Sequence, residues 1–190
     1  MSTAYSPNVV NDVAHITLGD GAIVKNFLTS EESMGACRGG SEFNVEIVIR
    51  DLELDNAYGP VSPYKRTDTH IAKLTVNYLE ITTDCISAGL PVITSDGSDE
   101  DGTYHKMVLD LEIKAAYVLG DITYKGRRWK TGTTGSDNDL IIILENAVNI
   151  DSFEFSFEHK SEVVASIVYT GFYGYATPTI PPWQVWDKGM

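Results

Sequence analysis

The sequence predicts a mainly β fold of two packed antiparallel sheets, a β-sandwich or barrel-like architecture with one short flanking α-helix. Three observations indicate it. Most of the chain alternates apolar and polar residues with the two-residue period of half-buried strands. Turn-forming residues recur between these runs, and one short segment carries the capping signals of a helix. Many short strands with a single helix are typical of packed sheets.

The clearest early strand pattern lies between residues 42 and 54. Its apolar face carries Phe43, Val45, Ile47 and Ile49, and the opposite face carries Glu42, Asn44 and Glu46. Residues 21–28 show a similar pattern before it, and residues 71–81 show one after it. In the later segment the apolar face carries Ala72, Leu74, Val76 and Tyr78. This alternation predicts antiparallel strands with one face covered and one face polar.

Residues 82–90 interrupt the alternation and predict the helix. Thr83 or Asp84 can cap its start, Gly89 can end it, and Pro91 stops it. Strand patterns then resume over Tyr104–Ala116, Val118–Trp129, Leu140–Glu145, Phe153–His159 and Val163–Tyr173. We therefore expect a single domain over residues 1–190. Its ends would be an extended N-terminal arm over residues 1–12 and a proline-rich C-terminal arm over residues 176–190.

The charge of the chain limits its partners. The formal net charge is −13, and a strongly acidic surface repels phosphate, so ordinary nucleic-acid binding is not expected. The same charge suits a surface that stays close to DNA without adhering. We see no apolar run long enough to span a bilayer and no signal-peptide pattern at the N-terminus. We expect no membrane insertion, and reduced thiols at Cys37 and Cys85.

No motif predicts catalysis, a cofactor or a metal site. The acidic segment Ser95–Gly102 fails the EF-hand pattern, because Asp101 and Met107 stand where that loop needs glycine and a bidentate acid. The segment Lys130–Gly135 lacks the ending of a phosphate loop and is expected to form a hairpin loop. The four histidines do not stand at ligand spacing. We therefore expect no enzyme and no cofactor.

One short segment reverses the acidic character of the chain. Residues 125–130 hold four of the fourteen basic residues, namely Lys125, Arg127, Arg128 and Lys130. A solvated hairpin tip would account for them. So would a basic docking patch that meets an acidic face of another copy of the chain, and both interpretations stay open.

Several short stretches between residues 36 and 81 carry a family resemblance. They are ACRGGSEF at 36–43, EIVIR at 46–50, Asp55 with GPV at 59–61, and AKLTVNYLEI at 72–81. In this combination and order they resemble the major tail proteins, or tail tube proteins, of long-tailed bacteriophages. In that family a glycine pair opens the second long strand, and a Gly-Pro-type loop leads to the next. Asn56 departs from the glycine usual after the turn aspartate, and Pro63 from a second loop glycine.

The resemblance implies a structural protein that self-assembles into stacked hexameric rings. These rings would form the hollow tube of the virion tail, through which DNA is delivered to the host. The implied partners are further copies of the chain, the tape measure protein inside the tube, and the tail terminator and baseplate or tip proteins at its ends. Double-stranded DNA would pass without specific binding. The protein would be made and assembled in the host cytoplasm. Type VI secretion tubes share the fold.

The tube interpretation assigns roles to three further sets of residues. The long loop over residues 58–69 would insert into the adjacent ring through Tyr58, Gly59, Pro60, Val61, Tyr64, Lys65 and Arg66. The segment over residues 30–41 would be a loop at an intersubunit contact, with Gly35, Arg38, Gly39 and Gly40. The acids expected to line the lumen are Glu42, Glu46, Glu53 and Asp55. The alternative for these acids is an outer, solvent-facing surface.

A β-sandwich binding or decoration module of a virion is the alternative function. Such a module would use exposed aromatic side chains, and Trp129, Trp183 and Trp186 are available. Tryptophans in hairpin and arm positions are more often packing anchors. We therefore rank the tube protein first, the binding module second and an enzyme last.

Overall fold

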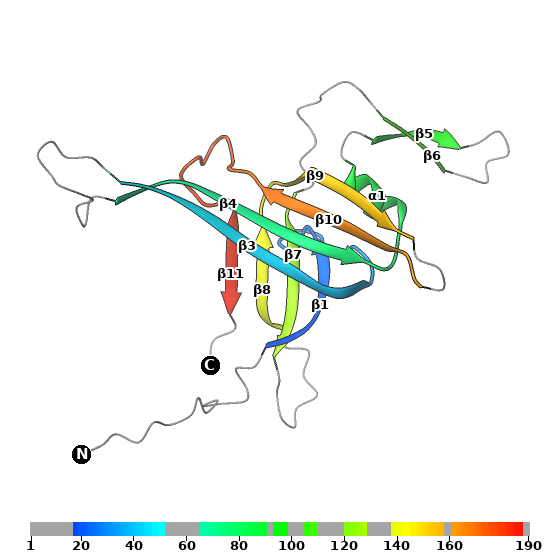
Figure 1. Cartoon of the computed structure of the whole chain (residues 1–190), viewed down its shortest axis with the longest axis horizontal. Helices are drawn as coiled ribbons and strands as arrows, with labels where there is room; N and C mark the ends of the chain where they lie inside the picture. Colours follow the sequence, from blue (N-terminus) through cyan, green and yellow to red (C-terminus); the bar gives the residue numbers. More distant parts are fainter. Residues whose placement is uncertain are drawn as a thin grey trace, which may run out of the picture.

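The computed structural model describes residues 17–51, 65–90, 93–98, 105–109, 120–128, 138–157 and 161–187 of the chain. Within them the protein is mainly β, with two antiparallel sheets and one short helix, so the predicted fold class is confirmed (Figure 1). A small separate hairpin pairs β5 (Ile93–Ser98) with β6 (His105–Leu109). The predicted N-terminal arm over residues 1–12 lies outside the described residues.

The larger sheet has five strands in the order β11-β8-β7-β1-β2. Its members are β1 (Thr17–Lys25), β2 (Glu32–Ser33), β7 (Ile122–Arg128), β8 (Asn138–Leu144) and β11 (Trp183–Asp187). The predicted C-terminal arm is therefore wrong over residues 183–187, because β11 pairs along β8, with Val185 opposite Ile142. The apolar residues of this segment favour a strand, whereas its prolines all precede it.

The second sheet has four strands in the order β3-β4-β10-β9. Its members are β3 (Cys37–Asp51), β4 (Lys65–Tyr78), β9 (Ala147–Ser156) and β10 (Val164–Gly171). Every neighbouring pair is antiparallel. The far ends of β3 and β4 run on past the rest of the sheet as a projecting hairpin (Figure 1). The predicted alternation is confirmed on β4, where Ala72, Leu74, Val76 and Tyr78 are all buried.

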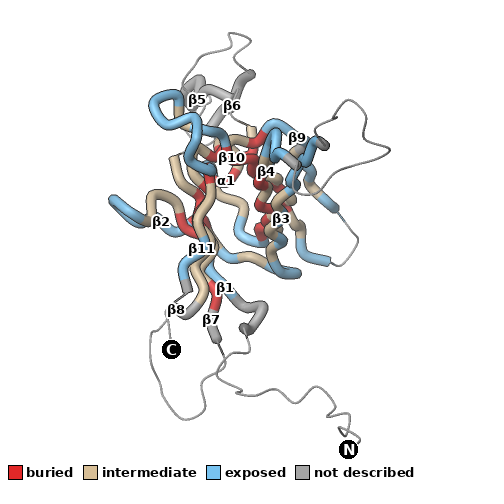
Figure 2. Tube along the Cα trace, turned by 90° about the vertical axis from the view of Figure 1, so that its left-hand side faces the viewer, coloured by how far each residue is buried: buried red, intermediate tan, exposed pale blue. Residues whose placement is uncertain are grey.

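The core lies where the two sheets face each other (Figure 2). Ile23 and Ile122 of the five-stranded sheet belong to the same buried cluster as Leu74 and Ile167 of the four-stranded sheet. Burying each large apolar side chain contributes about 1.5–3 kcal/mol. The hydroxyls of Tyr78 and Tyr169 lie 3.1 Å apart inside this core, so the two buried phenols satisfy each other.

Helix α1 (Thr83–Gly89) is the predicted helix, with its cap one residue earlier than expected. The Thr82 hydroxyl oxygen accepts a hydrogen bond from the backbone N–H of Cys85 at 3.1 Å. Gly89 is the last helical residue and packs against β9. A Cβ placed there would lie 2.5 Å from the ring of Phe153, so glycine allows the helix to approach the sheet closely.

Candidate functional site: the polar face of the four-stranded sheet

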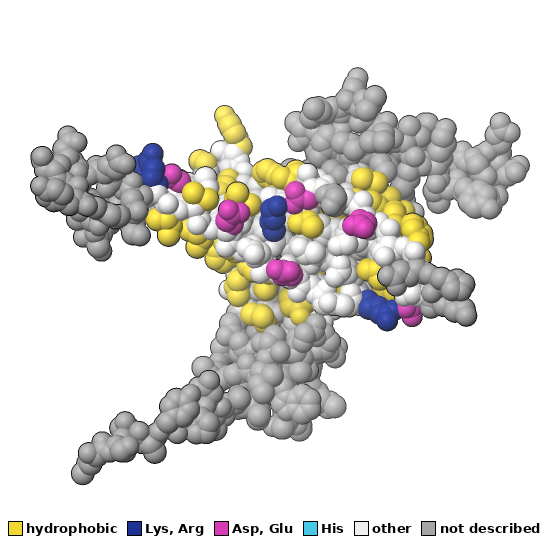
Figure 3. Space-filling view, viewed as in Figure 1, with side chains coloured by type: hydrophobic (Ala, Val, Ile, Leu, Met, Phe, Trp, Pro, Cys, Tyr) yellow, Lys and Arg dark blue, Asp and Glu magenta, His cyan; other side chains and the backbone are white. Residues whose placement is uncertain are grey.

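The four-stranded sheet turns one face to the core and the other away from it. We call the second face the polar face. It is formed by Glu42, Asn44 and Glu46 of β3, Lys73, Thr75 and Asn77 of β4, Ser166 of β10, and Asp151, Glu154 and Ser156 of β9. Each strand supplies these side chains because its alternate residues are committed to the core. Figure 3 looks onto this face, where acidic side chains lie scattered over a surface that is otherwise mostly uncharged.

The polar face is anionic. Four of its side chains are carboxylates and one is a cation, Lys73. The Lys73 Nζ lies 2.8 Å from the Asp151 Oδ2, so this cation is already paired. Among the residues that the structure describes, Glu42, Glu46 and Glu154 make no ion pair. The electrostatic potential over the face is therefore negative, and it repels polyanions.

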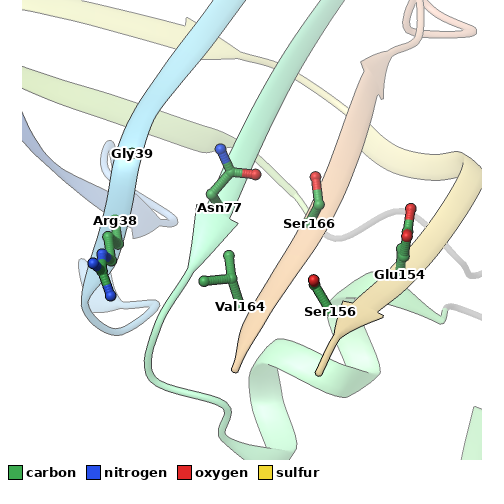
Figure 4. A pocket seen from close by; sticks show the side chains of 7 residues that line it. All are labelled: Arg38, Gly39, Asn77, Glu154, Ser156, Val164 and Ser166. Atoms are coloured by element: carbon green, nitrogen blue, oxygen red, sulfur yellow. The ribbon is translucent and has the colours of Figure 1, made fainter. Parts of the chain in front are cut away.

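One end of the polar face is hollowed. An open hollow of about 440 Å³ is lined by Arg38, Gly39, Asn77, Glu154, Ser156, Val164 and Ser166, which come from all four strands (Figure 4). The Arg38 guanidinium forms an ion pair with Glu162 at its rim. A backbone hydrogen bond and this guanidinium lower the pKa of the Glu162 carboxyl. The side chains that line the hollow supply one guanidinium, one carboxylate, one amide and two hydroxyls.

The predicted intersubunit loop over residues 30–41 is wrong in its second half, because β3 begins at Cys37. Gly35 lies between β2 and β3, whereas Arg38, Gly39 and Gly40 belong to β3, where the register with β4 shifts between Cys37 and Ser41. Gly39 and Gly40 have φ values of +83° and +84°. Their backbone conformation, which forms a β-bulge, accounts for the glycine pair.

The basic segment at residues 125–130, for which a docking patch and a solvated hairpin tip were both open, begins with Lys125 inside β7. Its side chain is 16% exposed, and its Nζ lies 2.8 Å from the Glu31 Oε1 and 5.4 Å from the centre of the Phe27 ring. Both contacts of this lysine are with residues of its own chain. Arg127 and Arg128 are also strand residues, opposite Leu18 and Thr17, and Lys130 lies outside the described residues.

The remaining predicted site residues divide between the sheet and the undescribed loop. Glu42 and Glu46 are exposed on the polar face. Glu53 and Asp55 lie outside the described residues, as do Tyr58, Gly59, Pro60, Val61 and Tyr64. The expected loop is wrong over residues 65–69, because β4 begins at Lys65. Arg66 is exposed and pairs across the strands with Arg50 in the projecting hairpin.

The sequence patterns did not predict which strands combine to form the polar face. Glu154 and Ser156 alternate with phenylalanines in the sequence, and this pattern predicts that they share one face of a strand. That this strand shares a sheet with β3 depends on long-range pairing. The contact between Lys73 and Asp151 joins residues 78 positions apart. No local signal predicts it.

A metal site, a membrane-spanning helix and a reactive cysteine each set requirements on the described residues. In these ranges no group of three or more His, Cys, Asp or Glu could hold a metal ion. The helix present there is too short and too polar to cross a membrane. Cys37 and Cys85 are free thiols, and burial raises the pKa of each to about 11, so neither is poised as a nucleophile. No protein-family model matches the chain, and no curated protein matches it by sequence.

Proposed function

We propose that the protein is a self-assembling structural subunit whose copies form stacked hexameric rings around a hollow tube. The tube would be the tail tube of a long-tailed phage, located in the virion and assembled in the host cytoplasm. One observation carries this proposal: the four-stranded sheet combines an anionic polar face with two open edges. The face suits a lumen, and the edges suit assembly. The family resemblance of residues 36–81 points to the same function.

The chemistry of the polar face supports passage of DNA, not capture of DNA. A DNA-binding surface presents free lysines and arginines to phosphates. A surface for single strands adds aromatic rings on which bases stack. The polar face instead presents carboxylates, amides and hydroxyls. Carboxylates on the wall of the proposed lumen repel the phosphates of a duplex, so the duplex can move through the lumen without binding to it.

The edges of the four-stranded sheet support a ring. Within the described residues β3 and β9 each pair on one side only. Because the sheet has four strands and every pair is antiparallel, β3 and β9 run in opposite directions. A rotated copy set beside the first can therefore continue the sheet with antiparallel pairing from β9 to the next β3. A contact of this kind is heterologous. It closes into a ring when the rotation between neighbouring copies is a whole fraction of a full turn, and in a closed ring every β3 edge is paired with a β9 edge.

Apolar side chains near both edges add to this argument. Ile47 and Ile49 are half exposed on the projecting part of β3. Ile150 and Phe157 are more than half exposed on and just after β9. Phe157 is 75% exposed and its ring lies 5.9 Å from that of Phe155, so the aromatic packing of β9 runs outward to the surface. In a ring, the apolar side chains near the β3 edge of one copy would pack against those near the β9 edge of the next copy.

A binding module remains the second candidate, and Tyr175 and Trp186 are exposed aromatic residues that would serve it. Two of the tryptophans, however, pack within the chain. The ring of Trp183 lies 6.0 Å from that of Phe43, and the ring of Trp186 lies 5.9 Å from that of Phe27. These contacts indicate anchors between elements and favour the tube.

Negative-stain electron microscopy of the purified protein tests the proposal. We expect long tubes built of regularly spaced six-fold rings, with a central channel wide enough for a DNA duplex. Sedimentation velocity at increasing protein concentration should show cooperative growth from monomers. A protein that stays monomeric across the accessible concentrations, or that forms only disordered aggregates, would overturn the proposal.

A further inference from the structure

Apart from Arg38, which pairs with Glu162 at the hollow, the cation of the polar face is Lys73. A carboxylate reaches it across an intervening strand. Lys73 lies on β4 and Asp151 on β9, and β10 runs between these two strands. The Lys73 Nζ and the Asp151 Oδ2 are 2.8 Å apart, and both side chains remain about 40% exposed. The pair is therefore accessible from the polar face, where a passing polyanion would compete with Asp151 for the ammonium group.

A bulge in β9 places Asp151 on this face. Asn149 pairs with Tyr169 and Phe153 pairs with Ile167, so residues 150–152 lie opposite Val168 alone. The extra residues break the alternation of β9. Asn149 stays buried beneath the sheet, whereas Asp151 turns to the polar face and meets Lys73.

Buried hydrogen bonds fix the shape of this bulge. The backbone N–H of Asp151 donates to the Asn149 Oδ1 at 3.0 Å. The Asn149 Nδ2 in turn donates to the carbonyl oxygen of Gly89, the last residue of α1, at 2.6 Å. Through these two hydrogen bonds, helix α1 on the core side fixes the backbone at Asp151, whose side chain lies on the polar face. Asn149 is a positioning residue for the Asp151 carboxylate.

We propose that Asp151 masks the charge of Lys73, so that the polar face offers no free ammonium group to DNA. This inference rests on the proposed tube function. Without the Asp151 carboxylate, the Lys73 ammonium would contact phosphates directly. Every subunit would present the same group, so the contacts of successive subunits with one duplex would add up through multivalency. Asp151 would thereby set whether the lumen lets DNA pass or retains it.

The test compares tubes assembled in the presence of short duplex DNA and then treated with a nuclease. The measured quantity is the nuclease-protected DNA per subunit at low ionic strength. We expect D151N tubes to protect at least about threefold more DNA than wild type, because one exposed ionic contact supports a factor of this size and the contacts of successive subunits add to it. The double variant D151N/K73Q should return to the wild-type level. High salt should remove the gain, because screening weakens exposed charge contacts.

Glu31→Gln is the matched control. It also removes one carboxylate and also frees a paired lysine, Lys125, but on the five-stranded sheet. We expect E31Q tubes to protect no more DNA than wild type. If D151N protects no more DNA than E31Q, or if D151N/K73Q protects as much as D151N, the masking role is wrong.

A separate measurement distinguishes this inference from the tube proposal. If the wild-type protein forms no tubes, the tube proposal fails, and masking is then tested on soluble subunits. The fluorescence anisotropy of a labelled duplex should show tighter, salt-sensitive binding to D151N than to D151N/K73Q. Equal binding by these two variants would overturn the masking role whatever the state of assembly.

Discussion

At the scale of single residues, the core contains a pair of buried phenol hydroxyls among apolar side chains. The hydroxyls of Tyr78 and Tyr169 have each other as partners, 3.1 Å apart. Burial raises the pKa of both groups well above the ordinary value for tyrosine. Such a pair fixes the register of β4 against β10, because a slip of β4 by one residue would turn the Tyr78 ring to the other face and separate the hydroxyls.

The phenol pair predicts a strong energetic coupling. Either Y78F or Y169F alone leaves one hydroxyl buried without its partner, which costs about 1–3 kcal/mol of unfolding free energy. The double variant Y78F/Y169F removes both hydroxyls and should be less destabilised than the sum of the single variants. Urea unfolding of the four proteins in a double-mutant cycle measures the coupling. Additive effects would show that the hydroxyls do not support each other.

The partly buried thiol of Cys37 and the buried thiol of Cys85 predict a loss of stability in alkaline solution. Burial raises the pKa of Cys37 and Cys85 from 9.0 to about 11 in the folded protein. The folded state therefore keeps these protons at a pH where the unfolded chain has lost them. The resulting contribution to stability is fully present below pH 9 and is lost as the pH rises to about 11. The urea midpoint should fall through this window, and C85A should flatten the fall.

At the scale of elements, α1 depends on its cap. A helix of seven residues is not stable by itself in water, so capping and packing must hold it. Replacing Thr82 by alanine removes the oxygen that accepts the Cys85 N–H and should cost about 1 kcal/mol of unfolding free energy. Thr83→Ala is the matched control at an exposed neighbour and should change stability by less than about 0.5 kcal/mol. Chemical denaturation distinguishes the two threonines.

The elements also show what sequence patterns can predict. The alternation in β3 and β4 is local, because each strand has one face on the core, and it predicted both strands and the polar side of Glu42 and Glu46. The helix was predicted from its breakers, Gly89 and Pro91, while the choice among three successive polar residues for the cap was wrong. The ion pair of Lys125 could not be predicted, because its partner Glu31 is 94 residues away. Strand β11 was missed because its pairing with β8 spans about forty residues.

At the scale of the whole molecule, the projecting end of β3 predicts where assembly can be blocked. Ile49 is 56% exposed, so I49D should leave the subunit folded and alter its circular dichroism little. In a ring or stack that buries this position, the new carboxylate would be desolvated without a partner, and assembly should fail. Sedimentation velocity and electron microscopy measure the effect. Leu28→Asp, at a position 53% exposed in the turn between β1 and β2, should still assemble. Normal tubes from I49D would exclude this contact.

Strand β11 also has a consequence for how subunits are made. It is the last described strand of the chain, yet it covers Phe43 of β3 and pairs with β8. Protein synthesis reaches it only after every other described strand has been translated. A chain interrupted before Trp183 would leave β8 without its neighbour and Phe43 without its aromatic contact. Interrupted products would therefore expose an apolar edge that chaperones and proteases recognise, and truncated chains would be removed before they accumulate.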